Sequence, residues 1–313
     1  MKLSIIIPCM NEEGNVEAMY KALNSTLKDI KYEALFINDG SSDKTLDKLE
    51  ELYNKDMQHV KVLSFSRNFG KEAAMLAGLN NAKGEYTCII DADLQQNPKY
   101  LLEMYNFLEE NNDYDEVAMV MGNKNHTGIM NLGKNCFYNL MNRLCDIKLE
   151  NAASDFRMFR ENVKKAMISL GEKNRFTKGV FSWVGFNVKY LPYKVEPRTS
   201  GKSSFGFISS MKYAFTGILA FSSKPLLWPI TLGIISLIIS FIYLVVLLIR
   251  AIVFSYSIKA TYVIILLLLF MFGIQFILIG IIGAYIAKIN LEVKNRPMYV
   301  IKKKLGFNED TIL

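Results

Sequence analysis

Two long stretches without charged residues dominate the last third of this 313-residue chain. Leu226 to Ile249 is an uncharged run, and Thr261 to Ala287 is a second one in which Gln275 is the strongly polar member. About 20 apolar residues are enough to cross a bilayer core of about 30 Å. A pair of buried helices in a large soluble core is the alternative, but such helices rarely continue for six or seven turns without a charge. We therefore predict two transmembrane helices.

The charges around these runs indicate their orientation. The turn between them carries Arg250 and Lys259, and more cations follow the second run: Lys288, Lys294, Arg296, Lys302, Lys303 and Lys304. The positive-inside rule then places both chain ends in the cytoplasm and predicts a multi-pass hairpin in the cell membrane. The lysines at 302–304 either touch anionic lipid headgroups or belong to a solvated tail.

Composition excludes several classes of protein. With 51% hydrophobic residues, the chain is neither a disordered polar protein nor a collagen-like one. Most of the net charge of +7 comes from the part after Lys224, so the folded domain lacks the basic stripe of a nucleic-acid-binding protein. The four cysteines form no C-x-x-C pair, which indicates reduced thiols in a cytosolic compartment.

The first 200 residues alternate between strand-like and helix-like segments. Strands are expected at 3–7, 34–38, 60–65, 86–90 and 117–122, and helices at 16–27, 44–53, 71–80 and 99–108. This alternation is typical of an α/β fold, an open and mostly parallel sheet with helices on both faces. We expect a soluble domain over residues 1–204, an amphipathic juxtamembrane segment over 205–224, the two membrane helices within 225–288, and a cytoplasmic tail over 289–313.

Polar clusters follow the first four expected strands. They are Asn11–Glu13, Asp39–Asp43, Ser66–Asn68 and Asp91–Asp93. In open α/β sheets, ligands bind beyond the carboxyl ends of the strands, so these clusters should converge on one edge.

Two of these clusters admit both a chemical and a purely structural interpretation. Asp91, Asp93 and Gln95 offer the hard oxygen ligands of a divalent metal, but short acidic pairs also cap helices. Asp39 could accept hydrogen bonds from a base or ribose, or simply form the turn that its Asp-Gly sequence favours. Pro8, Asn11 and Glu12 form a similar strand-end turn, which could line the same nucleotide pocket or serve as a helix N-cap.

Five short motifs in chain order carry a resemblance to a known family. They are Ser4–Glu13, Asn38–Asp43, Ser66–Lys71, Asp91–Gln95 and Ser154–Arg157. Together with the two membrane helices that follow, this set resembles the family 2 glycosyltransferases. More narrowly it resembles the polyprenyl-phosphate glycosyltransferases, which include dolichyl-phosphate mannose synthases and bactoprenol glucosyltransferases. The likeness extends from Ser4 to about Ile289.

The resemblance implies a GT-A-like (Rossmann-like) fold and an inverting transfer of one sugar from a UDP- or GDP-sugar, UDP preferred, to polyprenyl (undecaprenyl) phosphate, for cell-surface glycan synthesis or modification. Mg²⁺ or Mn²⁺ held by Asp93, with Asp91 and Gln95 nearby, would neutralise the departing diphosphate. Asp155 would orient the acceptor or complete its deprotonation. A buried ion pair or a helix cap is the structural alternative for Asp155.

The resemblance also implies two sets of binding residues. Those expected around the nucleotide-sugar are Pro8, Asn11, Glu12, Asp39, Asp43, Arg67, Lys71 and Asp91. Those expected around the acceptor phosphate are Lys124, Arg157, Arg198 and Lys202. Arg67 could instead pair with a carboxylate, and the stretch around Arg198 could be a flexible basic linker.

The chain departs from the family pattern at two places. Ser203 is followed by another serine rather than by lysine and an aromatic residue, and residues 122–126 replace an arginine-bearing stretch, where Lys124 or His126 could substitute. Other acceptors and roles therefore stay open: a diacylglycerol-type lipid acceptor, or a catalytically silent membrane subunit. Processive synthases are disfavoured because no Gln-x-x-Arg-Trp motif is present. Self-association through the membrane helices is a further possibility.

Overall fold

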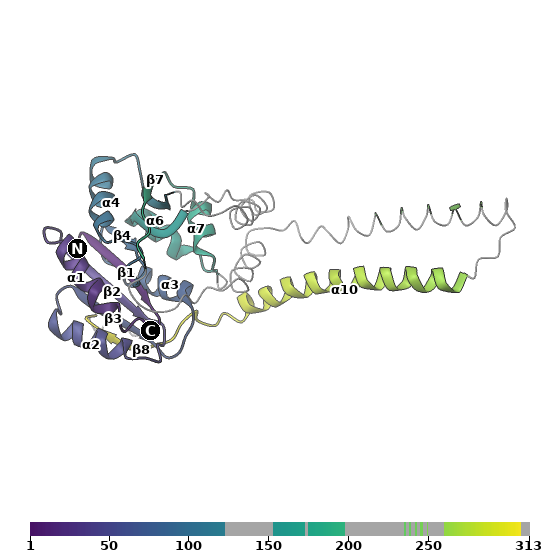
Figure 1. The fold of residues 1–313 in the computed structure, drawn as a ribbon, viewed down its shortest axis with the longest axis horizontal. Coiled ribbons are helices and arrows are strands. Elements are labelled where there is room, and N and C mark those ends of the chain that lie inside the picture. The colour runs from purple at the N-terminus through teal and green to yellow at the C-terminus, as the bar shows by residue number, and fades with distance from the viewer. Residues whose placement is uncertain are drawn as a thin grey trace.

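The computed structural model describes residues 1–122, 153–172, 175–197 and 260–307, together with six isolated positions between 235 and 249. One eight-stranded sheet with helices on both faces forms the N-terminal part, and one long helix projects from it (Figure 1). The elements are β1 (Leu3–Cys9), α1 (Val16–Thr26), β2 (Tyr32–Asn38), α2 (Thr45–Lys55), β3 (Val60–Phe65), α3 (Lys71–Asn81), β4 (Tyr86–Ile89), α4 (Lys99–Glu110), β5 (Glu116–Met121), β6 (Ala153–Arg160), α6 (Glu161–Ser169), α7 (Thr177–Val184), β7 (Val188–Tyr193), α10 (Ala260–Val293) and β8 (Ile301–Leu305).

The sheet has the strand order β7-β5-β6-β4-β1-β2-β3-β8. Strands β1 to β4 are mutually parallel, β5 and β7 are parallel to each other, and β6 and β8 run antiparallel to their neighbours. The chain therefore moves outward from β1 to β3 and then crosses back to β4 on the other side of β1. This reversal is the switch point at which open α/β sheets bind ligands. The prediction of a mostly parallel, GT-A-like sheet is confirmed.

Both faces of the sheet are covered, which explains why the central strands are apolar without alternation. In β2 every residue is buried, and in β1 all but Pro8 are. One face packs against α1, α2 and α4, and the other against α3, α6 and α7. The polar loops at the strand ends are therefore carried on a rigid frame.

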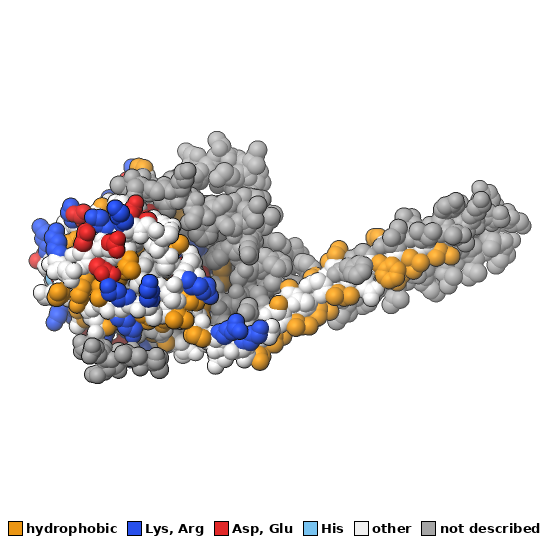
Figure 2. Space-filling view, turned by 90° about the horizontal axis from the view of Figure 1, so that it is seen from below, with side chains coloured by type: hydrophobic (Ala, Val, Ile, Leu, Met, Phe, Trp, Pro, Cys, Tyr) orange, Lys and Arg blue, Asp and Glu red, His pale blue; other side chains and the backbone are white. Residues whose placement is uncertain are grey.

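Helix α10 is the one element of the described chain that is long and apolar enough to cross a membrane. The segment that meets this criterion is Phe270–Ala287, and none of it is buried against the rest of the protein. Figure 2 shows apolar side chains along α10 and basic ones where it meets the sheet domain, where Lys294 and Arg296 are exposed. The structure describes six positions of the first expected span, and all six are helical and exposed. The expected juxtamembrane segment 205–224 lies outside the described residues.

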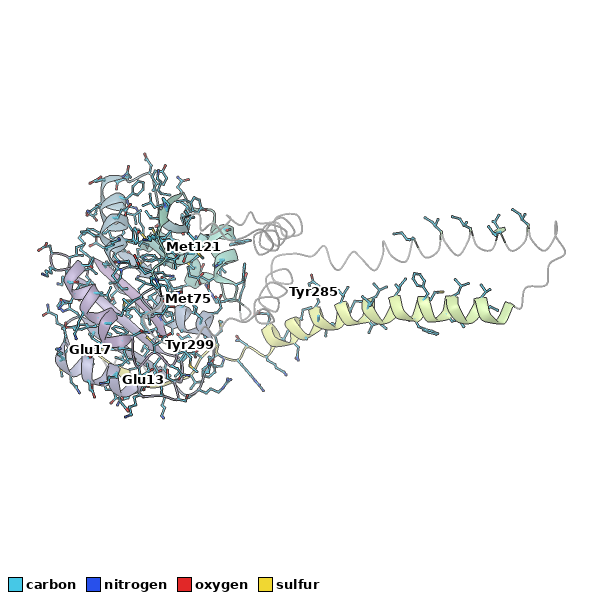
Figure 3. The ribbon with its side chains drawn as sticks, in the orientation of Figure 1. Glu13, Glu17, Met75, Met121, Tyr285 and Tyr299 are labelled. Carbon is cyan, nitrogen blue, oxygen red and sulfur yellow. The ribbon has the colours of Figure 1, made fainter. Side chains whose placement is uncertain are left out.

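The segment after α10 differs from the expected tail, because it contributes strand β8 to the sheet. β8 pairs antiparallel with β3, and Lys303 forms an ion pair with Glu50 at 2.7 Å. Just before it, Tyr299 stacks on Phe65 with 5.1 Å between ring centroids and accepts a hydrogen bond from the Asn80 amide. Figure 3 places Tyr299 at the foot of α10, against the sheet domain. Paired backbone and buried ring area stabilise this strand despite its lysines.

We expect Tyr299→Ala to lower the free energy of unfolding of the sheet domain by about 1–2 kcal/mol, because it removes a stacked aromatic ring. Urea unfolding of the detergent-solubilised protein, followed by fluorescence, measures this. Tyr299→Phe should retain most of the stability, and Met57→Ala, at a position 61% exposed, should change nothing. Equal stability of Tyr299→Ala and Met57→Ala would show that β8 is not held by this ring.

Candidate active site

The loops after β1, β2 and β3 interlock at one edge of the sheet. Asn11, in the left-handed region at φ 55°, donates its N–H to the Ser41 hydroxyl and accepts the Ser42 N–H. Gly40 lies so close to the third loop that a Cβ there would be 2.3 Å from the Arg67 carbonyl carbon. The predicted convergence of the polar clusters is thus present in the structure.

Asp39 holds the third loop in place. Its carboxylate is 4% exposed and accepts the N–H of Phe69 at 2.7 Å and of Gly70 at 2.9 Å. Burial raises the pKa of Asp39, and the two N–H donors oppose that rise. Gly70, at φ 98°, has a backbone conformation that side chains with a Cβ rarely adopt. Asp39 therefore shapes the loop that leads into α3.

The other residues expected near the nucleotide lie at the same edge, and several have structural partners. Asp43 accepts hydrogen bonds from the Thr45 backbone and hydroxyl and holds the turn before α2. Glu12 donates its N–H to the Thr45 hydroxyl and accepts a hydrogen bond from the Asn15 amide. Pro8 is the half-buried penultimate residue of β1. Arg67 is exposed, and among the described residues its partners are the Phe69 ring, 4.0 Å from its centroid, and the Asn68 carbonyl rather than a carboxylate.

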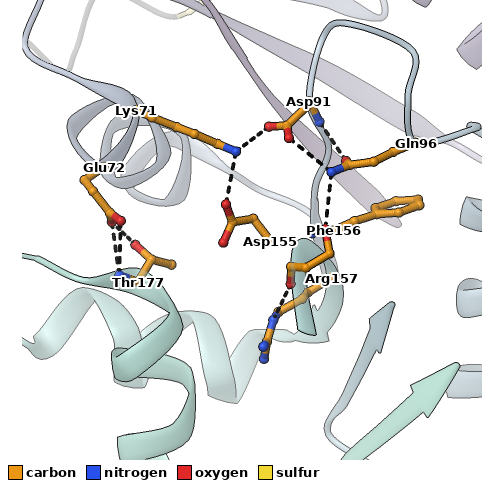
Figure 4. A network of polar contacts seen from close by, with 9 residues as sticks. Lys71, Glu72, Asp91, Gln96, Asp155, Phe156, Arg157 and Thr177 are labelled. Atoms are coloured by element: carbon orange, nitrogen blue, oxygen red, sulfur yellow. Dashed lines mark hydrogen bonds and ion pairs between the residues drawn. The ribbon is translucent and has the colours of Figure 1, made fainter. Parts of the chain in front are cut away.

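The register between β4 and β6 brings two carboxylates face to face. These strands pair antiparallel with Ile89 opposite Arg157, and continuing the register by two residues sets Asp91 opposite Asp155. The Lys71 ammonium bridges them, 2.5 Å from Asp91 Oδ1 and 3.0 Å from Asp155 Oδ2 (Figure 4). Residues expected separately for the donor, the metal and catalysis are therefore joined in one ion-pair network.

This network keeps Lys71 and Asp155 ionised. Burial acts to raise the pKa of Asp155, but Lys71 and then Lys178 outweigh it and lower that pKa to about 2. For Lys71, burial lowers the pKa, whereas Asp91 and Asp155 raise it to a net value above its usual range. Asp155 is consequently a carboxylate at every physiological pH, and a weak proton acceptor.

The loop that carries Asp93 is strained. Leu94 adopts φ 61°, a conformation that bulky residues avoid and that persists where the surroundings enforce it. Asp93 is 7% exposed and accepts the Gln95 N–H at 3.2 Å. The amide that reaches Asp91 belongs to Gln96, which donates to Asp91 Oδ2 at 3.1 Å and accepts the Asp91 N–H. The metal-ligand role expected for the Gln95 side chain stays a prediction.

The donor set at this edge fits a hard divalent cation that is shared with a substrate. Within the described ranges, no three His, Cys, Asp or Glu side chains form a cluster able to hold a metal alone. Mg²⁺ is commonly bound by one or two carboxylates together with substrate phosphates rather than by an all-protein cage. Asp91 and Asp93, on one strained loop, could supply such a pair.

Arg157 is placed in the core rather than at the acceptor side. Its guanidinium is 2.6 Å from Glu116 Oε1, donates to the Ser154 carbonyl and lies 4.5 Å from the Phe181 ring centroid. Arg157 is 4% exposed and Glu116 is fully buried, so this is a structural ion pair. The other expected phosphate ligands, Lys124, Arg198 and Lys202, lie outside the described residues.

Helix α7 contributes residues that the sequence analysis missed. Glu72, next to Lys71, accepts hydrogen bonds from the Thr177 backbone and hydroxyl at the start of α7. Lys178, the next residue, is half-buried and contributes to the field that lowers the Asp155 pKa. No local motif predicts the contact between Glu72 and Thr177, because these residues are 105 positions apart in the sequence.

The comparison with protein families decides the assignment. The model of the family "Glycosyl transferase family 2" matches residues 4–167, which is more than half of the chain and contains the whole ion-pair network. This chain belongs to glycosyl transferase family 2.

Relatives match this family 2 chain over almost their whole length. The Bacillus subtilis (strain 168) protein CsbB, named as a glycosyltransferase, is 38% identical over 311 residues, covering 98% of this chain and 93% of CsbB. The SfII prophage-derived bactoprenol glucosyl transferase of Shigella flexneri is 35% identical over 306 residues, covering 97% of this chain and 98% of that protein.

Among solved structures, glucosyl-3-phosphoglycerate synthase from Mycobacterium tuberculosis, solved with Mn²⁺ and UDP-glucose, is 14% identical to this chain. The match has a TM-score of 0.47 and covers 70% of this chain and 77% of that one.

We expect Arg157→Met to lower the free energy of unfolding by about 3–5 kcal/mol, because it leaves the buried Glu116 carboxylate without its counter-ion. Chemical unfolding measures the loss. The double variant Glu116→Gln with Arg157→Met should recover much of it. A phosphate ligand would behave in the opposite way: Arg157→Met would leave stability unchanged and raise only the KM for the acceptor.

Proposed function

We propose that this protein transfers one sugar, with inversion, from a nucleotide-sugar to a polyprenyl phosphate at the cytoplasmic face of the cell membrane. The observation that carries the proposal is the network of Lys71, Asp91 and Asp155 beside Asp93, at the switch point of a family 2 fold. Relatives named bactoprenol glucosyl transferases match over nearly full length and support a lipid-carrier acceptor.

The strand-end loops indicate where the nucleotide-sugar donor would bind. The edge formed by Asn11, Asp39 and Arg67 lies next to the carboxylates of the β4 loop, so a base and ribose there would direct a diphosphate toward Asp91 and Asp93. A bound Mg²⁺ or Mn²⁺ would offset the negative charge that develops on the departing diphosphate. Asp91 and Asp93 would hold that ion, and we favour a UDP-sugar over a GDP-sugar as donor.

The acceptor side follows from the charge of Asp155. A carboxylate whose pKa is lowered to about 2 is too weak a base to activate an alcohol efficiently. A phosphate monoester has a second pKa of about 6 and is largely ionised without assistance. Asp155 therefore suits a phosphate acceptor, which it would orient through its cationic neighbours, and it disfavours the diacylglycerol-type alternative.

The connection of β8 supports a membrane hairpin. Because β8 pairs with β3 in one sheet, the chain before and after α10 lies on the same side of any membrane that α10 crosses. A chain that returns to the side of the membrane from which it started must cross that membrane an even number of times. The uncharged run at 226–249 is the available partner span, and its described positions are helical. By the positive-inside rule, Lys294 and Arg296 beside the domain support a cytoplasmic location for that side.

A radiolabel transfer assay tests the reaction directly. We expect the purified protein, with undecaprenyl phosphate and Mn²⁺ or Mg²⁺, to transfer label from one of a panel of UDP- and GDP-sugars. A chelator and Asp93→Ala should each reduce transfer by at least about 1,000-fold, since both remove charge stabilisation of the leaving group.

Controls separate the competing functions. Asp113→Ala, which removes an acidic side chain from a surface loop, should transfer the sugar at the wild-type rate. Nucleotide binding without transfer to polyprenyl phosphate would favour another lipid acceptor. Absence of nucleotide binding would favour a silent membrane subunit.

Asp155→Asn distinguishes a phosphate acceptor from a hydroxyl acceptor. For a phosphate acceptor, we expect kcat to fall by less than about 100-fold, because the acceptor is already ionised and loses only orientation. A general base acting on an alcohol would cost up to about 10,000-fold. Initial rates between pH 6 and 8.5 measure the difference, and a loss that grows steeply at low pH would favour the hydroxyl acceptor.

A further inference from the structure

The Lys71 ammonium lies between the carboxylates of Asp91 and Asp155. Without it, another cation would have to neutralise these two charges. Asp91 follows β4 and Asp155 lies in β6, and each side chain keeps some exposure, at 32% and 19%. Without a positive charge between them, two facing carboxylates would repel strongly in this partly buried setting. Lys71 supplies that charge from the first turn of α3.

The backbone of Lys71 is fixed on both sides, whereas its side chain is held by ion pairs at its tip. The preceding Phe69 and Gly70 donate their N–H groups to Asp39, and the following Glu72 binds Thr177 of α7. The ammonium stands at the end of a four-carbon chain that is 31% exposed. Lys71 can therefore shift its charge by rotation about side-chain bonds while α3 stays in place.

Both oxygens of Asp91 already have partners. Oδ1 contacts Lys71, and Oδ2 accepts the Gln96 amide. A divalent cation that takes Asp91 Oδ1 as a ligand comes within a few ångströms of the ammonium there, and the two positive charges repel each other. The ammonium and the cation therefore compete for the same carboxylate.

We propose that Lys71 is a positioning residue that holds Asp91 in the donor-free protein and releases it, while remaining on Asp155, when the cation enters together with the nucleotide diphosphate. This inference rests on the proposed function. It follows that the protein alone binds a divalent cation weakly, because Lys71 must give up Asp91 without the diphosphate oxygens to complete the cation's shell. With nucleotide present, the released ammonium lies next to new anionic oxygens.

The test is the affinity for Mn²⁺ of the full-length detergent-solubilised protein, measured by the electron paramagnetic resonance signal of free Mn²⁺ with and without UDP. Without UDP, we expect Lys71→Met to bind Mn²⁺ about tenfold more tightly than the wild type, because the competing charge is gone. Lys71→Arg, which keeps the charge, should bind as weakly as the wild type. Lys44→Met, which removes an exposed lysine near the same edge, is the matched control and should change nothing.

If Lys71 had a purely structural role, Lys71→Met would disturb the loop and lower the affinity for Mn²⁺. Equal or weaker Mn²⁺ binding by Lys71→Met, with Mn²⁺ and UDP still bound by the wild type, overturns the Lys71 proposal alone. Failure of every variant to bind Mn²⁺ even with UDP overturns the metal-dependent function as well. Lys71→Gln, whose amide can still donate to Asp155, repeats the measurement if thermal melting shows that Lys71→Met is unfolded.

Discussion

The ion pair of Lys71 with Asp91 and Asp155 is the interaction on which the rest of the site depends. It joins the start of α3 and the loop after β4, which are close in sequence, to the start of β6, where Asp155 is 84 residues from Lys71. Each neighbour of Lys71 is anchored as well, on one side to Asp39 and on the other to α7. The loops therefore do not merely lie at one edge of the sheet but are fixed to one another through a single turn of helix.

Most of the central fold could be predicted because its signals are local. The strands up to β5 and the helices up to α4 begin and end within a few residues of their expected positions, since apolar runs and turn residues mark both ends. The list of site residues came from short motifs, and the structure brings Asp39, Lys71, Asp91, Asp93 and Asp155 to one edge as expected.

What could not be predicted depends on non-local pairing. The sequence around Arg157 does not reveal that its charge is neutralised by Glu116, because that contact arises from the packing of β5 against β6. Likewise the contact of the Gln96 amide with Asp91 could not be predicted, because it depends on the loop that contains the left-handed residue Leu94. Strand β8 has three lysines in five residues, and only its register with β3 makes it part of a sheet.

The position of β8 also constrains the order in which the protein can be assembled. Strand β3 is translated about 240 residues before its partner, and the apolar span of α10 lies between them. At about 5–20 residues per second, the edge of β3 stays uncovered for roughly 10–50 s during synthesis. The sheet therefore becomes complete only after the long apolar helix α10 has left the ribosome, so that closure of the sheet edge and release of this helix are coupled in time.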